Sequence, residues 1–226
     1  MIKPYTWKEV KTFLTKELQK TKHILTFGTF GSNNIEHDID LLITKKPTSP
    51  TSDFYKEIHG IFDSLNAYLN NKYGAKAIRF STSEEQYLIL NLSESSEKDI
   101  AFHSHIYTSY PQIQKDWGWA IFEDVDLDKF FKEKYKCIIG STEDLFSKQF
   151  MQKSYYDSIY NFLYRYDKIN SHYPKDLFLK VMNHFFDYLY RKRLGLKSPV
   201  AKNEKEVREY FYQLCDIVDK LSKERT

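Results

Sequence analysis

The sequence has 226 residues but only two cysteines, Cys137 and Cys215, and no apolar run long enough to cross a membrane. The cysteines lie far apart and match neither zinc-ligand nor redox spacing, so we expect reduced thiols. The first 25 residues are polar and lack the apolar segment of a signal peptide. These absences predict a cytoplasmic protein without a membrane partner.

The sequence also lacks a large excess of positive or negative charge. Lysine and arginine total 34 and aspartate and glutamate total 31, which gives a formal net charge of +3. This balance does not by itself indicate nucleic-acid binding, although it leaves local basic faces open. Apolar residues make up 41% and aromatic residues 17% of the chain, enough to build the core of one large domain or two small ones.

The most informative stretch runs from Ile24 to Ile43 and reads ILTFGTFGSNNIEHDIDLLI. Its two short apolar runs predict buried strands on either side of a glycine-containing loop. Because side chains alternate along a strand, Asp38 and Asp40 share one face. Two adjacent carboxylates repel each other unless they hold a cation, and Mg²⁺ prefers carboxylate and phosphate oxygens. The stretch therefore predicts a metal site beside a loop that can approach phosphate.

The order of Gly28-Thr29, eight further residues, then Asp38-Ile39-Asp40 resembles the signature of the polymerase-β-type nucleotidyltransferases. It departs from that signature in having Thr29 in place of serine and a short spacer. Gly31-Ser32 is the alternative pair, but its spacer is only five residues. We favour Gly28-Thr29, which we expect to end the first strand directly. The resemblance implies an α/β (α+β) mixed sheet with helices, followed by a helical C-terminal region.

The resemblance also implies a third carboxylate on a neighbouring strand. Asp99 is the best candidate, because it leads a strand-like segment that reads DIAFHSHI. That segment and the apolar run 86–92 are predicted to form a hairpin. Poorer rivals for the third carboxylate, which lie in polar or loop sequence, are Glu94, Glu97 and Asp116.

Three histidines lie near these carboxylates. His103 and His105 are predicted to share the strand face of Asp99, and a His-x-His pair is able to bind zinc. A second cluster of cysteine or histidine at metal spacing is missing from the sequence, so exposed or hydrogen-bonded histidines are favoured. His37 is interpreted as a loop residue.

The activity implied by the resemblance is transfer of a nucleoside monophosphate from an NTP to a hydroxyl group, with release of pyrophosphate. Asp38 and Asp40 would bridge two Mg²⁺ or Mn²⁺ ions, and Asp99 would hold the ion nearer the attacking hydroxyl. The segment 28–32 would bind the triphosphate. By role rather than by motif, the resemblance also suggests a phosphate-binding lysine, Lys153, and a base-stacking aromatic residue, Tyr156.

The sequence does not identify the acceptor of the nucleoside monophosphate, which could be RNA such as tRNA, a small molecule or a protein. One alternative is a catalytically inactive binding module with the same fold, and another is a toxin- or antitoxin-type partner protein. The oligomeric state is also open.

Hydrophobic periodicity predicts the remaining organisation. Helices are expected over 6–20, 53–73, 141–169, 174–195 and 203–221, a weak strand over 77–80, and irregular structure over 107–126. This pattern divides the chain into a catalytic domain, 1–110, and a mainly helical domain, 111–226. We expect the substrate between the two.

Overall fold

The computed structural model describes residues 3–31, 35–36, 38–80, 96–120, 126–152, 156, 159–160, 163 and 175–224. Within these residues the chain forms one five-stranded mixed sheet in the order β3-β4-β2-β1-β5. The strands are β1 (Ile24–Phe30), β2 (Asp38–Lys45), β3 (Ala77–Phe80), β4 (Ile100–Tyr107) and β5 (Lys136–Ile139). The predicted α/β class is confirmed.

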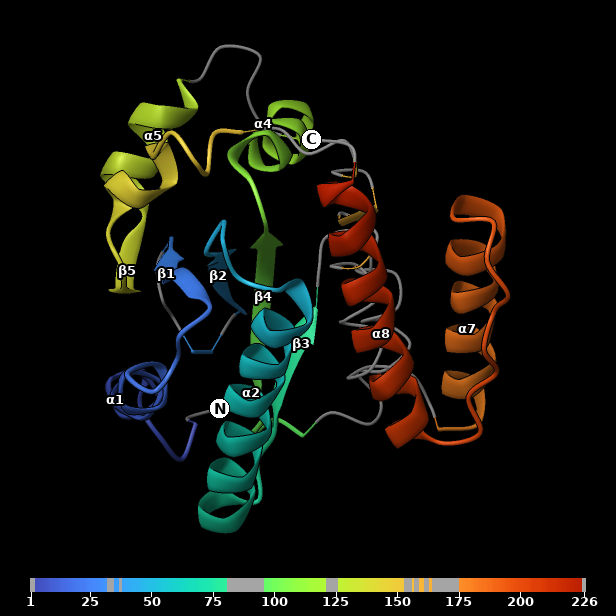
Figure 1. The fold of residues 1–226 in the computed structure, drawn as a ribbon. Coiled ribbons are helices and arrows are strands. Elements are labelled where there is room, and N and C mark those ends of the chain that lie inside the picture. The colour runs from blue at the N-terminus through green and yellow to red at the C-terminus, as the bar shows by residue number, and fades with distance from the viewer. Residues whose placement is uncertain are drawn as a thin grey trace.

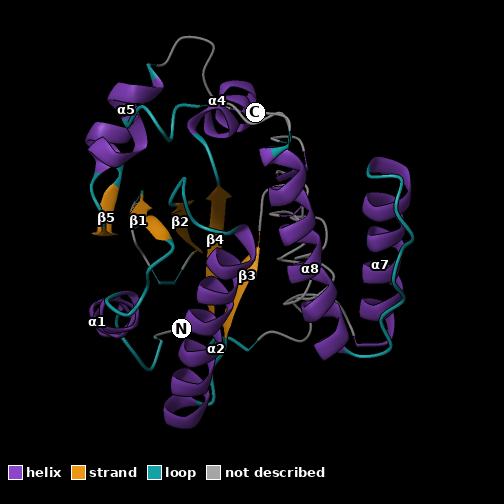
Figure 2. Cartoon of the chain, viewed as in Figure 1, coloured by secondary structure: helices purple, strands orange, loops and turns teal. Residues whose placement is uncertain are grey.

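Helices flank this sheet, and the last two described helices lie side by side beyond β3 (Figure 2). The described helices are α1 (Trp7–Leu18), α2 (Thr51–Tyr73), α4 (Tyr110–Ala120), α5 (Leu127–Lys134), α7 (Lys175–Phe186) and α8 (Glu204–Lys223), with a short 3-10 helix η2 (Thr142–Phe146) and a π-helical segment η3 (Asp187–Arg193). Among the described helices, none has the length and apolar character needed to span a membrane.

The sheet combines antiparallel and parallel pairs. β1 pairs antiparallel with both β2 and β5, whereas β4 pairs parallel with both β2 and β3. The chain leaves β2 through α2 and returns in β3, which is the helical crossover that parallel strands require. The predicted partner of β4, residues 86–92, lies outside the described residues, so the expected hairpin stays a prediction.

The two faces of the sheet pack against different elements. Ile39, Leu41 and Ile43 join the main hydrophobic cluster, which includes buried residues of α1 and α2. Leu42, on the opposite face, joins a second cluster with residues of α4 and α5. In Figure 1, α2 lies in front of the sheet, α1 lies below β1, and α4 and α5 lie above the strands. Strand alternation therefore directs neighbouring residues of β2 into two separate cores.

Local signals correctly predicted several helix ends. Thr6 caps α1 by accepting a hydrogen bond from the Glu9 amide, and Asn203 caps α8 by accepting one from the Glu206 amide. Gly74 ends α2 in the left-handed conformation, with φ of 63°. Gly195, with φ of 68°, follows the segment formed by α7 and η3, as expected.

The N-terminus of α2 is capped by another helix. Pro50 occupies the N-cap position and contributes no side-chain hydrogen bond. Instead, Asp219 of α8 accepts hydrogen bonds from the amide and hydroxyl groups of Thr51, at 2.6 and 2.7 Å. Asp216 accepts another from the Ser52 hydroxyl. These contacts join α8 to α2 and place negative charge where a helix favours it.

The structure differs from the sequence prediction in three described segments. The segment 107–126 was expected to be irregular, but it contains α4, whose buried face includes Ile113 and Trp117. The strong start signal at Ser141 begins η2, which has only five residues. Residues 147–152, expected to continue a long helix, are not helical, and most of the segment 153–169 lies outside the described residues. The unexpected strand β5 pairs with β1, so the sheet extends beyond residue 110.

Candidate functional site

Polar side chains gather where β2 runs beside β4. Asp40 pairs in register with His103, and Leu42 pairs with His105. Residues in register on neighbouring strands share a face, and side chains repeat on that face at every second position. Asp38, Asp40, His103 and His105 therefore project from the same face of the sheet, away from the main core.

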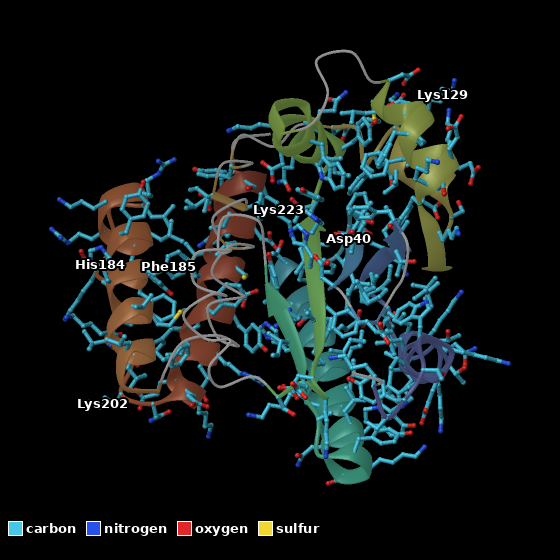
Figure 3. All side chains as sticks on the ribbon, turned by 180° about the vertical axis from the view of Figure 1, so that it is seen from behind. Asp40, Lys129, His184, Phe185, Lys202 and Lys223 are labelled. Atoms are coloured by element: carbon cyan, nitrogen blue, oxygen red, sulfur yellow. The ribbon has the colours of Figure 1, made fainter. Side chains whose placement is uncertain are left out.

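The closest contact within this group joins Asp40 and His103. Asp40 Oδ1 lies 3.0 Å from His103 Nδ1, and the exposed fractions of the two side chains are 32% and 12%. His105 is 7% exposed, and one ligand atom from each of Asp40, His103 and His105 lies within 4.8 Å of the others. Figure 3, seen from behind, labels Asp40 over the sheet. Asp38, at the start of β2, is exposed.

Three aromatic rings lie around His105. The imidazole centre lies 5.0 Å from Trp117, 5.5 Å from Phe30 and 6.5 Å from Tyr107. The Trp117 indole donates a hydrogen bond of 3.0 Å to the Tyr107 hydroxyl. Since these rings are buried in the second cluster, they hold His105 in a defined orientation.

Gly31 brings the backbone close to the same carboxylate. Its φ is +89°, and a Cβ added there would lie 3.3 Å from Asp40 Oδ2. β1 continues to Phe30, so the turn toward β2 begins at Gly31 rather than at Gly28. Ser32 lies outside the described residues.

Gly28 and Thr29 were expected to end the first strand, and that expectation is wrong. Both are interior residues of β1, where Gly28 pairs with Leu42. A Cβ on Gly28 would lie 2.5 Å from the Lys136 carbonyl oxygen and 2.6 Å from the Tyr135 ring. The missing side chain makes room for β5 and Tyr135, which is a packing requirement.

Thr29 is 3% exposed and pairs with Leu41, on the face opposite to Asp40. Its hydroxyl therefore points away from the predicted cation. The role of Gly28 and Thr29 in phosphate binding stays a prediction, and their surroundings in the sheet do not favour it.

The Asp99 carboxylate stabilises a turn at the start of β4. It accepts hydrogen bonds from the amides of Lys76 and Ser96, at 2.7 and 2.8 Å. Lys3 donates to the backbone carbonyl oxygens of Glu97 and Asp99. Burial lowers the pKa of Lys3, while the charge of Asp99 acts in the opposite direction.

Asp99 is thus not brought into the group formed by Asp40, His103 and His105. Of the rival carboxylates, Glu97 lies in the same turn, Asp116 lies on α4 and Glu94 is outside the described residues. Among the predicted nucleotide contacts, Lys153 also lies outside them. Tyr156 is buried in the main core, whose strand residues point away from Asp40.

The donor chemistry of the site fits a divalent cation. Asp38 and Asp40 offer carboxylate oxygens, and His103 and His105 offer imidazole nitrogens. The His-x-His pattern alone is a weak signal, so the sequence predicted only a minor role for the two histidines. The missing information was the parallel pairing of β2 with β4, which aligns His103 with Asp40.

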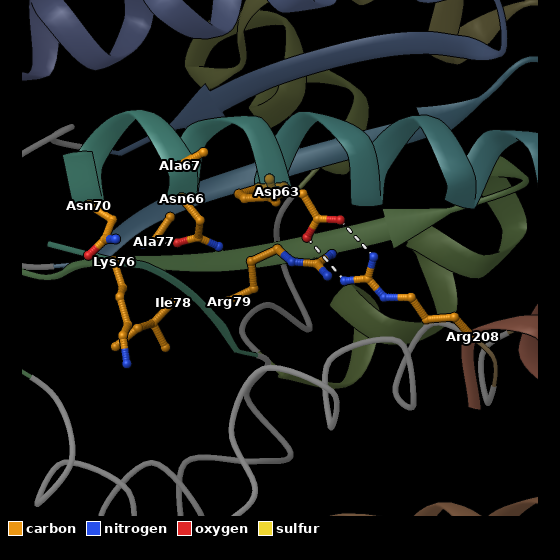
Figure 4. A pocket seen from close by; sticks show the side chains of 10 residues that line it. Asp63, Asn66, Ala67, Asn70, Lys76, Ala77, Ile78, Arg79 and Arg208 are labelled. Atoms are coloured by element: carbon orange, nitrogen blue, oxygen red, sulfur yellow. Dashed lines mark hydrogen bonds and ion pairs between the residues drawn. The ribbon is translucent and has the colours of Figure 1, made fainter. Parts of the chain in front are cut away.

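A second concave region lies between α2, β3 and α8, with a volume of about 450 Å³ (Figure 4). Its charged side chains are Lys76, Arg79, Arg208 and Asp63. Arg208 donates hydrogen bonds of 2.6 and 3.0 Å to Asp63, and the Arg79 guanidinium lies 4.7 Å from the centre of the Phe62 ring. Arg79 pairs with Phe102, a residue of the main core, so this cleft is on the face opposite to Asp40.

The chain was also compared with protein-family models, with curated proteins and with solved structures, and it matches none of them.

Proposed function

We propose that the protein is a metal-dependent nucleotidyltransferase, which moves a nucleoside monophosphate from an NTP to a hydroxyl acceptor and releases pyrophosphate. The observation that carries the proposal is the convergence of Asp38, Asp40 and Gly31. The two carboxylates share one strand face, and the Gly31 backbone passes close to Asp40. Carboxylates beside a close-approaching backbone suit a cation bound together with phosphate oxygens.

Asp38 and Asp40 would hold the cation. When bound, Mg²⁺ or Mn²⁺ neutralises charge on the phosphate oxygens and acidifies the attacking hydroxyl. Asp40 is oriented by its contact with His103, so its carboxylate has a fixed position before substrate arrives. Gly31, which has no side chain, leaves space for a phosphate group beside Asp40.

Two buried aromatic residues line one side of the proposed site. Phe30 and Trp117 are 7% and 5% exposed, and their ring centres lie 4.9 Å apart. They exclude water beneath the histidines, whereas the exposed Asp38 lies at the open end of the group. Electrostatic interactions with a phosphate strengthen where water is excluded.

Thermal denaturation with Mg²⁺, with an NTP and with both tests the proposal. The combination is expected to raise the melting temperature more than the two separate increases added together, because each ligand completes the site of the other. Ligand linkage reaches about 2.7 kcal/mol at a hundredfold excess over the dissociation constant. Asp38→Asn and Asp40→Asn should each abolish the synergy.

The matched control is Asp187→Asn, which removes a surface carboxylate paired with Arg191 and should keep the synergy. Incubation with each labelled NTP and pools of RNA, protein and metabolites then identifies the acceptor. Unchanged synergy in both Asp38→Asn and Asp40→Asn would refute the proposal.

A second candidate is a nucleotide-binding module or partner protein without catalytic activity. The position of Asp99 favours it, because both carboxylate oxygens are engaged by backbone amides. Such a protein would show the synergy with Mg²⁺ and NTP but would label no acceptor. Transfer of label that depends on Asp40 would exclude it.

A further inference from the structure

The group formed by Asp40, His103 and His105 has a composition unlike that of a magnesium site. Two of its three donors are imidazole nitrogens. Mg²⁺ prefers oxygen ligands, whereas imidazole suits Zn²⁺ and other transition-metal ions. The donor set therefore favours a different ion from the one expected at Asp38 and Asp40.

The spacing of the donors is compatible with one ion. Zinc binds nitrogen and oxygen ligands at about 2.0–2.1 Å, so two ligand atoms of a tetrahedral site lie about 3.3 Å apart. Asp40 Oδ1 and His103 Nδ1 are 3.0 Å apart, the length of the hydrogen bond that joins them without an ion, and the proton of that bond must leave before both atoms bind one ion. No two ligand atoms of the group are more than 4.8 Å apart. To reach tetrahedral spacing around one ion, a pair of these atoms would therefore approach by at most about 1.5 Å.

The backbone and the aromatic rings preorganise these donors. Parallel pairing of β2 with β4 aligns Asp40 with His103, and His105 follows on the same face. His105 is packed beside Phe30 and Trp117. An apolar shell of this kind limits solvent access and strengthens metal binding.

We propose that Asp40, His103 and His105 bind one transition-metal ion, for which Zn²⁺ is the probe. The proposal deepens the proposed function, because Asp40 would be shared with the cation at Asp38 and the two histidines would replace the third carboxylate. Binding of the ion itself requires neither nucleotide nor catalysis.

Calorimetric titration of chelator-treated protein with Zn²⁺, in the absence of nucleotide, measures this binding. We expect one equivalent of Zn²⁺ to bind, and a large excess of Mg²⁺ not to displace it. His105→Asn and Asp40→Asn should each weaken the affinity at least tenfold. Titration with Co²⁺ should give a visible absorption spectrum typical of nitrogen and oxygen ligands.

One variant serves as a matched control. His184→Asn removes an exposed histidine on α7, away from the group. It should bind Zn²⁺ with the affinity of the unaltered protein. Because His105 is buried and its variant risks misfolding, imidazole resonances of the unaltered protein provide an independent measurement. Zinc should shift those of two of the seven histidines.

The absence of stoichiometric zinc binding, or shifts confined to histidines other than His103 and His105, would overturn the metal site. Loss of zinc binding in His184→Asn would do the same. The synergy of Mg²⁺ with NTP is measured separately. A protein that binds zinc but lacks the synergy would refute the transferase and keep the metal site, and the opposite result would refute the metal site alone.

Discussion

The Cα of Gly28 lies against the ring of Tyr135, so closely that a Cβ on Gly28 would be 2.6 Å from it. The Tyr135 hydroxyl forms hydrogen bonds of 3.0 Å with the Thr26 hydroxyl and the Leu42 carbonyl oxygen. Burial raises the pKa of Tyr135 well above its ordinary value, so its hydroxyl stays protonated. Tyr135 thereby ties the start of β5 to the centre of the sheet.

This contact predicts the effect of Gly28→Ala. The added methyl group would also lie 2.5 Å from the Lys136 carbonyl oxygen, which is backbone and unable to move far. We expect the free energy of unfolding to fall by about 1–3 kcal/mol, the usual cost of overpacking. Denaturant unfolding measures the change.

Gly60→Ala is the matched control for Gly28→Ala. Gly60 is exposed within α2, and a Cβ there meets no atom within 4 Å. Alanine should stabilise the helix by up to about 1 kcal/mol. If Gly28 serves packing alone, folded Gly28→Ala protein keeps its NTP affinity. A large loss of NTP affinity with little change in stability would instead support the predicted phosphate contact.

The second prediction concerns the cap that α8 supplies to α2. Asp219→Ala removes the acceptor for the Thr51 amide and hydroxyl and for the Tyr160 hydroxyl. Loss of a charged acceptor that leaves donors unsatisfied costs about 1–3 kcal/mol. Hydrogen exchange should accelerate at the first amides of α2. Asp187→Ala, which removes an exposed i,i+4 ion pair, should lower the unfolding free energy much less than Asp219→Ala does. Equal losses in the two variants would contradict this role for Asp219.

The capping of α2 shows where sequence information ends. Thr6 and Asn203 each cap a helix through an amide three residues away, so the local pattern is sufficient to identify them. The cap of Thr51 lies 168 residues farther along the chain. The residues around Pro50 give no sign of this cap, because Asp219 reaches the start of α2 only when α8 packs against α2.

The candidate site shows the same limit. Periodicity placed Asp38 and Asp40 on one face of a strand and His103 and His105 on one face of another. It did not indicate that the two strands are parallel neighbours with Asp40 beside His103. The role expected for Asp99 depended on a hairpin that would fix the register of β4. In the structure the register is set by β2 and β3.

The third prediction is a pH dependence of stability. Glu9 accepts hydrogen bonds from Lys72 and from the hydroxyls of Tyr68 and Tyr73. The Lys72 ammonium, followed by the two hydroxyls, lowers the pKa of Glu9 from 4.5 to about 2. Because the pKa of Glu9 is lower in the folded state than in the unfolded state, ionised Glu9 stabilises the fold. This contribution is complete above about pH 4.5 and is lost as the pH falls through about 2.

Because the Glu9 cluster lies at the surface, its contribution should be below about 1 kcal/mol. The difference in unfolding free energy between the unaltered protein and Glu9→Gln should therefore shrink between pH 5 and pH 2, taken as approximate limits from the linkage relation. Glu133→Gln, whose carboxylate lies 4.0 Å from Lys129, is the control. A difference for Glu9→Gln that grows on acidification would have the wrong sign and would contradict the assignment.

The last prediction separates a structural role of Asp99 from a metal-binding one. Asp99→Asn keeps one oxygen acceptor but places an amide group against either the Lys76 or the Ser96 N–H. Losing one of these hydrogen bonds to the buried Asp99 side chain should lower the unfolding free energy by about 1–3 kcal/mol. Denaturant unfolding measures this change, with an unaltered slope if the unfolded state is unaffected.

The same Asp99→Asn protein also tests the cation site. If Asp99 supports only the turn, the folded variant retains the synergy between Mg²⁺ and NTP, whereas Asp40→Asn loses it. The physical reason is that both oxygens of Asp99 are directed to backbone amides rather than toward Asp40. A variant with nearly unchanged stability but no synergy would restore Asp99 as the third metal ligand, and would require β4 to take a different register beside β2 when the cation is bound.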